Sequence, residues 1–337
     1  MINLIESGHW LPLVFAFLMG LSMLIYGLLD GYDLGVGVLS KFVSTRDEKN
    51  TMIASIGPFW DANETWLVLG VGILLVAFPK AHGIILSELY IPVFIMLIGL
   101  IFRGIAFDFR MKAQDKYKNY WDNAFFYGSL ITALAQGYML GSYIVGFEES
   151  WQATIFSILV GFGVAVGYCL IGANWLIMKT EGDLQKKAIN WAKFSLYGAV
   201  ICIFLVSVVT PVTSARIFNK WFAYPLIIYL SLVPLITGLL ILWMRHTLQK
   251  LPLKDDALCW LPFVLTIAVA ILCFGGLAYS FYPFIVPGKM LIIQAAASTS
   301  SLLIILVGAL IVLPILFAYT FLAYKIFHGK SSLLKYD

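Results

Sequence analysis

Nine apolar runs of about 20 residues constrain this chain more than any other feature, because a helix of that length crosses the hydrocarbon layer of a bilayer. We read them at residues 11–40, 59–78, 84–107, 122–146, 153–178, 190–210, 222–244, 257–281 and 299–327. Charged residues make up only 12% of the 337 residues, whereas in soluble proteins they make up about a quarter. The sequence therefore predicts an all-α polytopic membrane protein with nine transmembrane helices.

The positive charges are unevenly distributed between the two sides of the predicted helices. Of the 22 Lys and Arg residues, 18 follow odd-numbered runs and four follow even-numbered runs. Since Lys and Arg are retained on the cytoplasmic side, the pattern predicts a periplasmic amino terminus and a cytoplasmic carboxyl terminus. The polar breaks are short and no cleavage site follows the first run, so we expect one integral membrane domain over residues 1–337 that keeps its first helix.

Acidic residues recur near the predicted cytoplasmic ends of the first three helices. A carboxylate near the centre of a membrane helix costs roughly 2.5–3.5 kcal/mol, so it needs a partner or a function. The first run ends in GLLDGYDLGVG, the second begins in GPFWDANETW, and the third ends in FRGIAFDFR. These motifs supply Asp30 and Asp33, Asp61 and Glu64, and Arg103 with Asp108.

Helical spacing groups these residues by face. Asp30, Asp33 and Gly37 share one face of the first helix, and Asp61, Glu64 and Thr65 share one face of the second, because residues three and four apart are neighbours. Gly27, Gly31 and Gly35 form a ladder of small residues that predicts close approach of another helix. Small residues at 294–301 (QAAASTSS) indicate either a helix contact or a loose start of the last helix.

The pattern of acids is typical of a proton path or an ion site that opens to the cytoplasm. A structural interpretation stays open beside it, in which Asp30, Asp33 and Asp61 cap helices or pair with Arg103 and Lys41.

Ligands for a cofactor are scarce. The four histidines (His9, His82, His246 and His328) lie at the ends of runs or in loops, and the four cysteines are isolated in apolar segments. Haem and metal sites need such side chains in pairs or clusters inside the fold. We therefore expect no haem and no metal on this chain's own ligands, and no nucleic-acid partner.

The three acidic motifs, in this order within the first 110 residues, resemble subunit II of cytochrome bd quinol oxidase. The form PFWDANETW is similar to the cyanide-insensitive branch of that family. The resemblance is strong in the first third of the chain and weaker beyond it. Many members have histidine where this chain has Phe59, so no proton-path role is transferred to that position.

This resemblance implies a fold of two four-helix bundles plus a peripheral helix in the bacterial inner membrane. It also implies a haem-free chain that supports assembly of subunit I, which carries haems b and d (or b only) and a periplasm-facing quinol site. Asp30, Asp33 and Asp61 would serve cytoplasmic proton uptake, with Glu64, Arg103 and Asp108 as further candidates. Small single-span subunits are left open, and no motif for a structural quinone is present.

Two other functions compete with this one. An ion-coupled secondary transporter would also place acids in membrane helices, although transporters typically show internal repeats and broken helices at the midplane. A purely structural assembly partner would use the same acids for packing or ion pairs.

Overall fold

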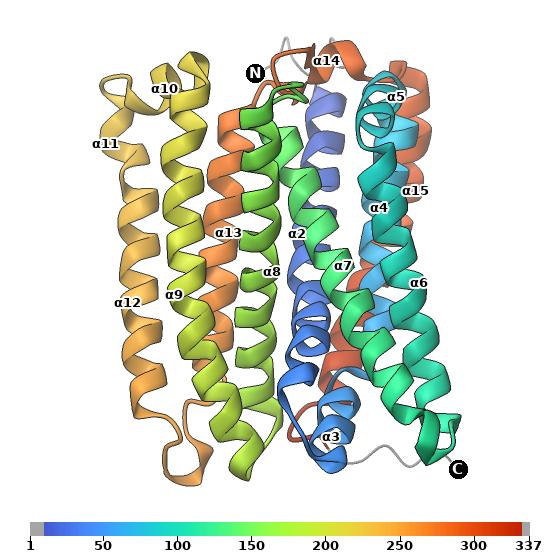
Figure 1. Ribbon diagram of the computed structural model, residues 1–337. Helices are drawn as coiled ribbons and strands as arrows, with labels where there is room; N and C mark the ends of the chain where they lie inside the picture. The colour runs from blue at the N-terminus through green and yellow to red at the C-terminus, as the bar shows by residue number, and fades with distance from the viewer. Residues whose placement is uncertain (1–9, 332–337) are drawn as a thin grey trace.

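Nine long helices run between the two ends of the molecule (Figure 1) in a computed structural model that describes residues 10–331. They are α2 (Trp10–Leu39), α4 (Trp60–Ala77), α6 (Tyr90–Lys112), α7 (Lys118–Ile144), α8 (Trp151–Lys179), α9 (Gly182–Thr213), α12 (Leu232–Lys250), α13 (Leu261–Phe281) and α15 (Thr299–Ile326). The fold is that of an all-α, multi-pass membrane protein, as the apolar runs predicted.

Within residues 10–331, eight helices are long and apolar enough to cross a membrane. The exception among the nine long helices is α7, which carries Asp122, Asn123 and Gln136. Despite these polar residues, α7 lies among the other long helices. It packs along α6, α8 and α2, and Asp122 and Gln136 form hydrogen bonds with side chains of α6 and α2.

Short elements connect the long helices at both ends. They are η1 (Ser40–Phe42), α3 (Arg46–Ile56), α5 (Pro79–Glu88), η2 (Asp115–Tyr117), α10 (Ala215–Phe222), α11 (Leu226–Leu230), η3 (Lys254–Asp256), α14 (Ile292–Ala295) and an antiparallel pair of strands, β1 (Phe284–Val286) and β2 (Met290–Leu291). These segments were predicted as polar breaks or as parts of the long runs, and not as separate elements.

The segment STRDEKN, expected to be a simple break, begins the amphipathic helix α3. Thr45 caps it by accepting a hydrogen bond from the Glu48 backbone N–H, as N-cap residues do. Residues 52–56 of α3 are buried under the lower end of the bundle. Its polar start is fixed by ion pairs to the α6–α7 connection, to α7 and to α9, which are Arg46 with Asp115, Lys49 with Asp122, and Glu48 with Lys187.

The glycine ladder of α2 lies against α8, as predicted. A Cβ placed on Gly35 would lie 1.8 Å from the Tyr168 carbonyl oxygen, and one on Gly172 of α8 would lie 2.7 Å from the Val36 nitrogen. No side chain fits at either position, so the two backbones are in direct contact. Because α2 also packs on α4 and α7, this contact places its acidic residues in the interior.

The last helix, α15, packs on α4 and α2, and most of its surface is exposed. Both expectations for residues 294–301 hold in part. The Ala297 N–H donates to the Ala77 carbonyl at 2.8 Å, which is a contact of small residues with the end of α4. The Ser298 hydroxyl accepts from the Ser301 N–H and so caps α15 after a short extended segment.

Candidate buried acidic site

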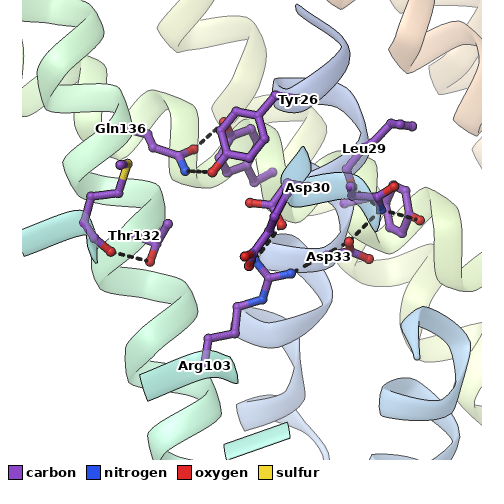
Figure 2. Close-up of polar contacts among 12 residues, drawn as sticks. Tyr26, Leu29, Asp30, Asp33, Arg103, Thr132 and Gln136 are labelled. Atoms are coloured by element: carbon purple, nitrogen blue, oxygen red, sulfur yellow. Dashed lines mark hydrogen bonds and ion pairs between the residues drawn. The ribbon is translucent and has the colours of Figure 1, made fainter. Parts of the chain in front are cut away.

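Two carboxylates of α2 and one guanidinium of α6 form the centre of the site (Figure 2). The Asp30, Asp33 and Arg103 side chains are fully buried. Arg103 Nη1 lies 2.5 Å from Asp30 Oδ1, and its Nη2 lies 3.8 Å from Asp33 Oδ2. Of the acids predicted to pair with Arg103, the two on α2 do so. The other predicted partner, Lys41, instead donates to Asn123 Oδ1.

Glu64 of α4 is the outer member of the cluster. Its Oε1 lies 3.6 Å from Arg103 Nη1, and its side chain is 29% exposed. One guanidinium thus faces three carboxyl groups, and one positive charge cannot compensate three negative charges in a buried site. Acids that share a site in this way are electrostatically coupled to one another.

Several polar atoms of the cluster are free for further bonding. Asp30 Oδ2 and Asp33 Oδ1 accept no hydrogen bond from the described part of the chain, and Arg103 Nε donates none to it. Buried polar atoms without a partner cost free energy, so atoms in this state are suited to bind protons or water molecules.

Asn63 of α4 supports Asp33 and was not predicted as a site residue. Its Nδ2 donates to Asp33 Oδ2 at 2.8 Å and to the Tyr32 hydroxyl at 3.0 Å. The signal was available in the sequence, because Asn63 shares a helical face with Trp66 and Gly70, which are both buried. Only the charged residues of this motif were predicted as site residues.

A second polar group extends from Asp30 toward α7 and α8. Gln136 Nε2 donates to the Tyr26 hydroxyl at 2.6 Å, and the Tyr168 hydroxyl donates to Gln136 Oε1 at 2.7 Å. Figure 2 shows Tyr26 and Gln136 on the side of Asp30 that lies away from Arg103. These hydrogen bonds cross three helices and fix the surroundings of Asp30.

Asp61 and Asp108 are not brought into the cluster, and both are exposed in this chain. The physical reason is helical phase. Asp61 lies two residues, or about 200°, from the inward-facing Asn63, and Asp108 lies about 140° from the inward-facing Arg103. Both residues still lie near the lower ends of their helices. Spacing placed them at the correct depth, but it did not show that they face outward.

The described histidines do not gather at one place in the fold. His82 lies on α5, His246 near the end of α12 and His328 just after α15, while His9 falls outside the described residues. In residues 10–331 no group of three or more His, Cys, Asp or Glu side chains is placed to hold a metal ion. Haem needs axial ligands that face into the fold, and these three histidines are spread over separate helix ends and connections.

Comparison with known proteins decides the family. The profile described as "Cytochrome bd terminal oxidase subunit II" matches residues 11–327. The chain belongs to this family. Among its relatives, subunit 2 of the cytochrome bd ubiquinol oxidase of Bacillus subtilis is 29% identical over 90% of this chain and 92% of its own length. Subunit 2 of the cytochrome bd-I ubiquinol oxidase of Escherichia coli is 30% identical over 57% of this chain and 55% of its own length.

The fold comparison agrees with the sequence comparison. A chain of the bd oxidase from Geobacillus thermodenitrificans superposes with a TM-score of 0.76, covering 94% of this chain and 98% of that chain at 15% identity. The chain is thus a subunit of a cytochrome bd-type terminal oxidase, a membrane oxidoreductase. The resemblance drawn from the three acidic motifs is confirmed at the level of the family, and its branch stays a prediction.

Proposed function

We propose that this subunit II is the haem-free partner of a haem-bearing subunit I in a bacterial inner-membrane quinol oxidase. In this function it supports assembly of subunit I and takes up cytoplasmic protons for the reduction of O2 to water, so that turnover generates proton motive force. The observation that carries the proposal is the buried cluster of Asp30, Asp33 and Glu64 around one arginine.

The proposed route starts at the lower end of the molecule and follows the acids in order of increasing burial. Asp61 and Asp108 are exposed, Glu64 is partly exposed, and Asp30 and Asp33 are buried. We assign proton capture to the exposed pair, transfer to Glu64, and storage to the two acids of α2. Arg103 keeps the inner acids in place and lowers the cost of their negative charge in a low-dielectric interior.

The packing supports the family architecture and a ninth membrane-spanning helix. We assign α7 as this helix, because it runs beside α6 and α8 over its length. The two four-helix bundles are then α2, α4, α6, α7 and α8, α9, α12, α13, with α15 peripheral, all in a single integral membrane domain. The lysine-rich lower end faces the cytoplasm in this arrangement.

The redox groups are assigned to the partner. The Bacillus and Escherichia relatives are named as subunits of ubiquinol oxidases, and we extend quinol oxidation to the complex that contains this chain. Haems b and d, or b only, would be held by subunit I, where they supply electron transfer and oxygen reduction. Small single-span subunits fit the same assembly, and lipid surrounds it.

Two measurements on the purified complex test the proposal. Visible absorption from co-purified haems together with quinol-dependent oxygen consumption supports an oxidase, whereas a colourless chain that moves ions would support the transporter. For the proton role, Glu64→Gln should slow oxygen consumption with haem content intact. Glu149→Gln, an exposed acid at the opposite end, is the matched control. Full turnover in an assembled Glu64→Gln complex would make the acid structural.

A further inference from the structure

Three side chains from three helices form a closed hydrogen-bonded ring beside Asp33. Asn63 Nδ2 of α4 donates to the Tyr32 hydroxyl of α2 at 3.0 Å. The Tyr32 and Tyr324 hydroxyls lie 2.7 Å apart. The Tyr324 hydroxyl of α15 donates to Asn63 Oδ1 at 3.4 Å. A residue near the end of the last helix thus joins the buried site through the amide of Asn63.

The orientation of the Asn63 amide sets the direction of the hydrogen bonds around the ring. The Tyr324 proton is used on Asn63, so the hydrogen bond between the hydroxyls is donated by Tyr32, whose own oxygen accepts from Asn63. A reversed amide would set Asn63 Oδ1 against the Asp33 carboxylate and the Leu29 carbonyl, which are both acceptors. Asp33 and Leu29 therefore orient the amide with its N–H group toward Asp33, and the two tyrosine hydroxyls bond to the amide in this orientation.

The rings of the two tyrosines are held independently of their hydroxyls. Tyr32 stacks on Trp175 with ring centroids 4.2 Å apart, and Tyr324 stacks on Phe59 at 4.5 Å. Phenylalanine at either position keeps these contacts. The hydroxyl contribution can thus be removed without removing the packing.

We propose that Tyr324 is a positioning residue that, through Tyr32 and Asn63, holds a hydrogen-bond donor on Asp33 and ties α15 to the acidic site. The inference rests on the proposed role of Asp33 in proton uptake. The charged groups that face Asp33 are Arg103 of α6, Asp30 of its own helix and Glu64 of α4. None of these belongs to α15, and the hydrogen bond from Tyr324 to Asn63 connects that helix to the cluster.

The test uses the complete purified complex with Tyr32→Phe, Tyr324→Phe and the double variant. Tyr319→Phe, an exposed tyrosine on the same helix, is the matched control. The infrared band of the Asp33 carboxyl group, identified by its loss in Asp33→Asn, should move in each ring variant and stay in place in the control. Turnover should fall about twofold to tenfold, which is the effect of one hydrogen bond.

A closed ring also predicts how the variants combine, because the ring opens when any one of its members is lost. The band shift in the double variant should equal that in each single variant, and additive shifts would overturn the ring. An unmoved band in an assembled Tyr324→Phe complex would overturn it as well. Tyr32→Phe opens the same ring from α2, so either single variant can test whether the ring is present. A shifted band with unchanged turnover would leave the ring standing and refute proton uptake through Asp33.

Discussion

Alanine at each of the three ladder glycines of α2 tests how this helix is positioned. A Cβ on Gly27 would lie 3.9 Å from the Tyr168 hydroxyl, which is an ordinary contact. On Gly31 it would lie 2.7 Å from a ring carbon of Tyr168, and on Gly35 it would lie 1.8 Å from the carbonyl oxygen of that residue. Steric conflict therefore grows along the helix from Gly27 to Gly35.

The expected destabilisation depends on how far the backbones of α2 and α8 have to separate. At Gly35 the two backbones must separate by about 1.5 Å, and a gap of 0.5–1 Å already forfeits roughly a quarter to a half of the dispersion energy. Overpacking typically costs about 1–3 kcal/mol, while alanine returns at most about 1 kcal/mol of helix propensity. We expect losses of about 0, 1–2 and at least 3 kcal/mol for Gly27→Ala, Gly31→Ala and Gly35→Ala.

Thermal unfolding of the purified complex, followed by loss of haem absorbance, measures this series. Gly167→Ala on α8 is the control, because a Cβ there meets nothing within 4 Å. The midpoints should fall in the order Gly27, Gly31, Gly35, with the control at the wild-type value. A Gly35→Ala complex as stable as the wild type would refute the close contact of α2 with α8.

Two further substitutions probe the charges. Arg103→Met leaves the buried Asp30 and Asp33 and the partly exposed Glu64 without a counter-charge, so we expect a loss of about 3–5 kcal/mol. Adding Asp30→Asn should restore a large part of it in the same unfolding assay, and no rescue would contradict the pairing. Outside the membrane, the hydrogen bond from Lys187 lowers the pKa of Glu48. The stability from this pair is present above the ordinary glutamate pKa of about 4.3 and is lost as the pH falls through the lowered value. Between pH 7 and pH 3 the free energy of unfolding of Glu48→Gln should therefore fall less than that of the wild type, by under about 1 kcal/mol. Parallel pH curves would argue against the pair.

The sequence predicted most of the membrane architecture because its signals are strong. A run of about 20 apolar residues has few other uses, and the bias of Lys and Arg reports one side of the membrane. The polar helix α7 was still recognised by its run, and the ladder of Gly27, Gly31 and Gly35 correctly indicated close helix contact. The helix α3 was missed, because eleven residues with a charged start are similar to a loop.

The site was predicted only in part, since charge shows which residues need an explanation and leaves their direction open. Asp30, Asp33, Glu64 and Arg103 meet in the structure, whereas Asp61 lies outside the buried cluster. Helical phase explains the difference, because a residue two positions from an inward-facing one points away. The contribution of Tyr324 depends on packing between the first and last helices, and no local pattern reports such a contact.

Time-resolved proton uptake tests the central claim most directly. The complex, reconstituted in vesicles with its lysine-rich end exposed to a pH-indicating dye, is reduced and then exposed to oxygen. We predict uptake from that side in the wild type, and slower uptake with unchanged haem content in Asp33→Asn. Wild-type uptake kinetics in a fully assembled Asp33→Asn complex would contradict the account.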